Sequence, residues 1–130
     1  MKPRRERRSH PRRRAEERVR VTVLSAEKAP HLERRRFTCS TQDLSVGGLR
    51  FRSQRLIPLG ALITLHIAAP HPLREFDMKA RVVWLIEGRQ GERHAVGARF
   101  TDVPKSRFNA WRRMLEEKTL RQDAPRIPHV

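Results

Sequence analysis

Apolar and polar residues alternate with a period of two along much of this chain, and this pattern restricts its fold more than any other feature. Residues 18–24 read RVRVTVL, so Val19, Val21 and Val23 fall on one side of an extended chain. Successive side chains of a β-strand point to opposite faces, so the pattern predicts a strand with one buried face. Five further stretches follow the same pattern. The six expected strands lie within residues 18–24, 36–44, 49–53, 61–67, 77–87 and 94–100.

The apolar spacing changes after Pro104. Phe108, Trp111 and Leu115 recur at intervals of three and four residues, which predicts a helix that ends near Arg121. Short links between the six strands favour an antiparallel sheet, and closing such a sheet removes its exposed edges. We therefore expect a mainly β domain over residues 18–121. It would be a six-stranded antiparallel β-barrel with a C-terminal helix that plugs one end or packs on the barrel wall.

Positive charge is concentrated ahead of this domain. The chain has 30 Lys and Arg residues against 14 Asp and Glu, a net charge of +16, and ten of the basic residues fall in the first twenty positions. We interpret residues 1–17 as a flexible basic arm and residues 122–130, which contain two prolines, as a frayed tail. Such an excess of charge favours phosphate-bearing partners: nucleic acid, nucleotides or an anionic membrane surface.

The chain offers few groups suited to catalysis or metal binding. Cys39 is the single cysteine and alternates in phase with Phe37, which indicates a buried thiol and leaves no partner for an internal disulfide. The six histidines show no metal-ligand spacing, and Ser45 lacks the G-x-S-x-G context of a nucleophile elbow. There is no apolar run of about 20 residues and no secretory signal. We expect a cytoplasmic protein that is not an enzyme and needs no cofactor.

The stretch DLSVGG, residues 43–48, is one candidate binding site. Asp43 and Ser45 are two residues apart, so in an extended chain their side chains point the same way. A carboxylate accepts hydrogen bonds and a hydroxyl donates or accepts them, which suits the donor edge of a guanine base. Gly47 and Gly48 permit an unusual backbone conformation or the close approach of a ligand. The same residue types also form ordinary turns, so the stretch alone does not decide between the two.

The stretch RRSHPRRR, residues 7–14, is the other candidate. Arg8 and Arg12 are separated by three residues, and Arg7 directly precedes the first of them. A guanidinium group is planar and permanently charged, and it can bind a phosphate, pair with guanine or stack on a base. Taken alone, the stretch is typical of a solvated run of charge.

Together, the two stretches resemble the PilZ domain family. The first motif is RSHPR, residues 8–12, and the second is DLSVGG, residues 43–48, at a strand junction. The stretches PLGALITLHI, ARVVWLI and HAVGARFTDVP are also similar to that family. The resemblance extends over roughly residues 5–118 and implies a six-stranded barrel that is a receptor for cyclic di-GMP, the bacterial second messenger.

The resemblance also implies a role for each motif residue. Arg8 and Arg12 would bind phosphate and guanine from the arm, while Asp43 and Ser45 would meet a guanine edge on the barrel. Gly47 and Gly48 would let the ligand approach the backbone. Arg7 occupies the position that accompanies binding of a stacked ligand dimer. The bound state would be recognised by an unidentified downstream protein.

Two other interpretations of the charge stay open. A general nucleic-acid-binding basic β-barrel is the main alternative, but the chain has no tyrosine, five phenylalanines and no aromatic-rich strand for base stacking. Attachment of the basic arm to an anionic membrane could accompany ligand binding. Trp84 and Trp111 each lie in phase with apolar neighbours, so we expect both in the core.

Overall fold

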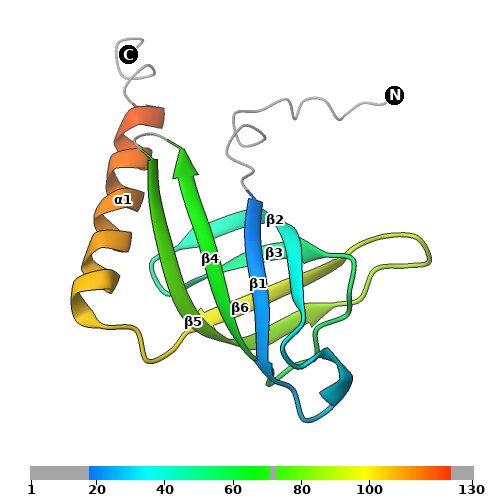
Figure 1. Ribbon diagram of the computed structural model, residues 1–130. Coiled ribbons are helices and arrows are strands. Elements are labelled where there is room, and N and C mark those ends of the chain that lie inside the picture. Colours follow the sequence, from blue (N-terminus) through cyan, green and yellow to red (C-terminus); the bar gives the residue numbers. More distant parts are fainter. Residues whose placement is uncertain (1–17, 71–72, 124–130) are drawn as a thin grey trace, which may run out of the picture.

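Six strands and one helix make up the described part of the chain (Figure 1). The computed structural model describes residues 18–70 and 73–123, so the arm expected at 1–17 lies outside them, as do residues 124–130 of the expected tail. All neighbouring strands are antiparallel, and the sheet closes in the order β1-β2-β3-β6-β5-β4. The predicted six-stranded antiparallel barrel with a C-terminal helix is confirmed. The strands are β1 (Arg18–Ser25), β2 (Arg36–Ser45), β3 (Gly48–Ser53), β4 (Leu62–Pro70), β5 (Leu73–Ile86) and β6 (His94–Phe100), with a 3-10 turn, η3 (Pro30–Leu32), between β1 and β2.

The apolar face of each strand fills the barrel. On β1, Val21 lies opposite Leu65 of β4 and Val23 lies opposite Ile63, and all four side chains are fully buried. Burying one side chain of this size contributes about 1.5–3 kcal/mol. Because each strand buries its apolar face, the alternation in the sequence favours a sheet that closes around a single core.

Cys39 belongs to this core, as its phase predicts. Burial raises the pKa of its thiol, while a hydrogen bond with Ser53 and the charge of Arg93 act in the opposite direction. A protonated, buried thiol is a poor nucleophile, because the thiolate is the reactive form. Cys39 is thus a packing residue.

The helix α1 (Lys105–Asp123) closes the barrel end that carries the β2–β3 turn. Trp111 is fully buried, and its ring meets the edges of Phe76 and Phe100 at centroid distances of 5.3 Å each. Its indole Nε1 donates a hydrogen bond of 2.8 Å to the carbonyl oxygen of Ser45. The helix therefore plugs one end, as expected, and runs two residues beyond the predicted end at Arg121. Among the described residues, no helix is long and apolar enough to cross a membrane.

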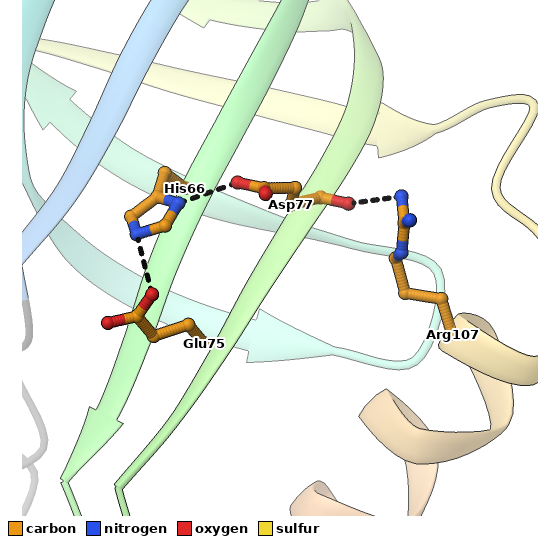
Figure 2. A network of polar contacts seen from close by, with 4 residues as sticks. All are labelled: His66, Glu75, Asp77 and Arg107. Atoms are coloured by element: carbon orange, nitrogen blue, oxygen red, sulfur yellow. Dashed lines mark hydrogen bonds and ion pairs between the residues drawn. The ribbon is translucent and has the colours of Figure 1, made fainter.

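Polar contacts on the outer surface join β4, β5 and the helix (Figure 2). His66 Nδ1 lies 2.6 Å from Asp77 Oδ1, and His66 Nε2 lies 3.5 Å from Glu75 Oε1. Arg107 of α1 donates to the main-chain oxygen of Asp77 at 2.9 Å. These contacts tie the first half of the helix to the long β4–β5 hairpin.

The expectation that Trp84 lies in the core is wrong. A β-bulge separates Val82 from Trp84, so the alternation of β5 changes phase at this point. Leu85 now packs against the core, while Ile86, expected in the same phase as Val82, is 55% exposed. Trp84 lies half-buried on the outer surface, where it can contact a ligand.

Candidate ligand-binding site

A β-bulge also turns Asp43 and Ser45 outward. On β2, Thr41 lies opposite Phe51, but Asp43 lies opposite Arg50, so one residue is inserted between them. Without that insertion, the alternation that buries Thr41 would direct Asp43 into the barrel as well. With it, Asp43 and Ser45 are both exposed, and they share one face of the strand, as their spacing in DLSVGG predicts.

The β2–β3 turn holds Ser45 in place. The two strands meet in a two-residue hairpin, with Ser45 paired to Gly48 across it. Ser45 Oγ donates to the carbonyl oxygen of Gly48 at 3.1 Å, and the carbonyl oxygen of Gly47 accepts from the Phe100 amide at 2.8 Å. With the indole of Trp111 bound to the Ser45 carbonyl, the turn is fixed from the sheet and from the helix.

Gly48 is required by a close approach of two strands. It pairs with Arg99 of β6, and a Cβ atom at Gly48 would lie 2.0 Å from the carbonyl oxygen of Ala98. Such a contact is impossible without moving the backbone. A Cβ at Gly47 would meet nothing within 4 Å, so the surrounding protein does not demand glycine there.

Four strands place one row of residues across the outer wall. Asp43 of β2 lies opposite Arg50 of β3, which lies opposite Gly97 of β6, which lies opposite Trp84 of β5. Gly97 leaves room for the indole, since its own Cβ would lie 3.0 Å from that of Trp84. The Arg50 guanidinium covers the Trp84 ring at 4.7 Å from its centroid, a cation–π contact.

This row forms the floor of an open hollow of about 670 Å³. Ligand pockets in proteins are commonly about 300–1,000 Å³. The hollow combines an acceptor and a hydroxyl with two guanidinium groups and aromatic surface. Its lining includes Asp43, Ser45, Gly47, Gly48, Arg50, Trp84, Gly97, Arg99 and Phe108.

The structure thus brings together four of the seven predicted site residues. Asp43, Ser45, Gly47 and Gly48 all line the hollow. The predicted arginines, Arg7, Arg8 and Arg12, lie outside the described residues.

The sequence interpretation missed Arg50, Trp84 and Arg99. The two arginines appeared as ordinary polar positions of alternating strands. Trp84 sits in VVWLI, a run of five apolar residues that cannot show which side of a strand each residue takes. That loss of alternation was the signal for a bulge, since a regular half-buried strand would have kept the period of two.

A comparison with models of protein families shows to which family this sequence belongs. The sequence model of the PilZ domain matches residues 6–117. The chain belongs to the PilZ family. The match includes both stretches that carry the resemblance, residues 8–12 and 43–48.

Solved structures show the same fold. The inhibitor of motility MotI/DgrA of Bacillus subtilis aligns with a TM-score of 0.61 at 16% identity, over 92% of this chain and 57% of its own. The PilZ domain of YcgR from Escherichia coli, solved with c-di-GMP, aligns with a TM-score of 0.59 at 15% identity, over 85% of this chain and 89% of its own. This PilZ chain therefore spans little more than half the length of MotI/DgrA. A sequence comparison with curated proteins found no match.

Proposed function

We propose that this PilZ protein is a receptor for cyclic di-GMP that binds the dinucleotide and does not transform it. The observation that carries the proposal is the outward row Asp43–Arg50–Gly97–Trp84, with Ser45 beside it in the same open hollow. Support comes from the family match over both motifs and from the YcgR PilZ domain, whose structure contains c-di-GMP.

The groups of the hollow suit a guanine nucleotide. The Asp43 carboxylate can accept from the N–H groups of a guanine edge, and the Ser45 hydroxyl, which donates its proton to the Gly48 carbonyl oxygen, can accept beside it. The Trp84 ring and the Arg50 guanidinium offer flat surfaces for a base, while Arg50 and Arg99 supply positive charge for phosphates. Neither a lone carboxylate nor a basic patch would recognise both the guanine bases and the phosphates of the ligand.

The arm arginines can reach this hollow. Arg18 lies opposite Ser40 on β2, and Asp43 follows three residues further along that strand, about 10 Å away. Arg12 precedes Arg18 by six positions, and six extended residues span up to roughly 20 Å. We assign Arg8 and Arg12 to the phosphates and guanine, as the motif implies.

Arg7, directly before the motif, favours a stacked ligand dimer at the site. In the proposed mechanism, the arm orders over the ligand and creates a surface that a downstream protein recognises. The compartment is the cytoplasm, where a single free thiol such as Cys39 stays reduced.

Replacing one carboxylate tests the site. We expect Asp43→Ala to weaken cyclic di-GMP binding roughly tenfold to hundredfold, because hydrogen bonds to a charged group contribute about 1.5–3 kcal/mol. Glu87→Ala is the matched control, since it also removes one exposed carboxylate but does not line the hollow. Calorimetry gives both affinities.

The same variant separates this function from general nucleic-acid binding. A duplex binder loses affinity steeply with salt, at a log–log slope of about −0.9 per phosphate contact, and removing a carboxylate would leave its affinity unchanged or higher. Equal cyclic di-GMP affinity for Asp43→Ala and Glu87→Ala would refute the proposed site.

A further inference from the structure

Three exposed leucines lie at the barrel end opposite the helix. Leu24 at the end of β1 is 41% exposed, and Leu56 and Leu59 in the β3–β4 link are 39% and 44% exposed. Because the strands are antiparallel, the β1–β2 and β3–β4 links lie at the same end, while the β2–β3 turn and α1 lie at the other (Figure 1). None of the three leucines lines the ligand hollow.

Arginines adjoin these leucines. The main chain beside Leu24 is bonded to the β1–β2 link, because the Arg34 amide donates to the Val23 carbonyl at 2.7 Å. Arg55, next to Leu56, covers the ring of Phe37 at 5.8 Å from its centroid. We call Leu24, Leu56 and Leu59, with the exposed side chains of Arg34, Arg35 and Arg55, the leucine tip.

The barrel end with the leucine tip carries a net positive charge. The β5–β6 link, residues 87–93, also lies at this end. The three links and the first residue of β2, residues 26–36, 54–61 and 87–93, contain Lys28, Arg34, Arg35, Arg36, Arg55, Arg89 and Arg93 against Glu27, Glu33, Glu87 and Glu92. Glu33 Oε2 accepts from the Ala26 amide at 3.2 Å. The ion pairs between described residues involve His66 and Arg74, so no described carboxylate forms a salt bridge with the arginines of the tip.

We propose that the leucine tip binds the surface of an anionic lipid bilayer. Separate exposed leucines on loops can enter the boundary between headgroups and acyl chains while neighbouring arginines meet lipid phosphates. A nucleic acid fits less well, since the large exposed apolar residues of the described chain are Leu, Val and Ile, without an aromatic ring for base stacking. This inference is independent of cyclic di-GMP binding.

Vesicle sedimentation with the full chain tests the tip. Vesicles of phosphatidylcholine alone are compared with vesicles containing 30% phosphatidylglycerol, a composition of about one acidic lipid in three chosen to create a negative surface potential. We expect binding to the acidic vesicles, and we expect Leu24→Ser/Leu56→Ser/Leu59→Ser to lower the partition coefficient at least about tenfold. Val46→Ser, which removes an exposed valine at the other barrel end, should leave it unchanged.

Two double variants, each of which removes two positive charges, complete the test. Arg35→Gln/Arg55→Gln should lower the partition coefficient by roughly fivefold per arginine, whereas Arg112→Gln/Arg113→Gln on α1 removes the same charge far from the tip and should have a smaller effect. The basic arm is present in every variant, so its contribution to vesicle binding is the same in each and cancels when their partition coefficients are compared. Thermal unfolding checks that all of these variants are folded.

The proposal is overturned if the tip variants partition as the wild type or as their controls do. That result would assign any vesicle binding to the arm. It is also overturned if no chain binds the acidic vesicles.

Discussion

Gly47 and Gly48 are neighbours in the sequence, but they are glycines for different reasons. A side chain at Gly48 would collide with the β6 backbone at Ala98, whereas Gly47 faces open space at the edge of the hollow. The fold therefore requires glycine at position 48, whereas at position 47 the proposed reason for glycine is the close approach of the ligand.

Alanine at each position separates these roles. We expect Gly48→Ala to lower the free energy of unfolding by at least about 2 kcal/mol, since overfilling a packed region typically costs about 1–3 kcal/mol. For a domain of this size, thermal denaturation should show a melting temperature lower by roughly 8 °C or more. Gly47→Ala should melt with the wild type and lose affinity for cyclic di-GMP. Equal melting temperatures for the two variants would contradict the assignment.

Among the elements, α1 has the most direct connection to the candidate site. Its buried Trp111 donates to the carbonyl oxygen of Ser45, the residue whose hydroxyl lies in the hollow. A change at the turn is therefore coupled to the helix through one hydrogen bond and the surrounding aromatic contacts with Phe76 and Phe100.

Substitution of Trp111 should lower stability, whereas substitution of Trp84 should weaken ligand binding. Trp111→Phe keeps most of the ring packing but leaves the Ser45 carbonyl without its donor, at a cost of about 1 kcal/mol. We expect its melting temperature to fall by roughly 4–8 °C. Trp84→Phe, on the outer surface, should change stability little and weaken ligand binding. Thermal denaturation and titration of both variants check this, and a stable Trp111→Phe variant would argue against the coupling.

The order and type of the elements could be predicted from periodicity, because strands and helices bury one face at fixed intervals. The predictions of one apolar face for residues 61–67 and of apolar helix positions at Trp111 and Leu115 are confirmed for this reason. The positions of the bulges on β2 and β5 could not be predicted in the same way. The run VVWLI signals that the alternation of β5 fails but not at which residue, and one inserted residue reverses the phase of everything after it. That is why Trp84 was assigned to the core and why the full row across the site was missed.

The directions of Asp43 and Ser45 were correct relative to each other, because a spacing of two is enough to put them on one face. Their position on the outer face depends on the bulge before Asp43 and on pairing with β3. The meeting of Asp43, Arg50, Gly97 and Trp84 depends on strand order, which brings β6 between β3 and β5. No local pattern in the sequence contains that information.

For the molecule as a whole, the account predicts a change in the arm. Hydrogen exchange at the amides of residues 7–14 should slow when cyclic di-GMP saturates the protein, because the proposed mechanism has the arginines of this stretch close over the ligand. The β1 strand, already bonded on both sides by β2 and β4, should change little and acts as an internal control. Unchanged exchange across residues 7–14 at saturation would contradict the switch.

Calorimetric titration of the full chain with cyclic di-GMP is the decisive experiment for the proposed receptor function, since one titration gives both affinity and stoichiometry. We expect saturable heat with about two ligands per chain, as the position of Arg7 before the motif implies. We also expect a shallow dependence on salt, because a dinucleotide carries few phosphates. The absence of heat at high micromolar ligand would contradict a receptor for cyclic di-GMP, and a stoichiometry of one would contradict the stacked dimer.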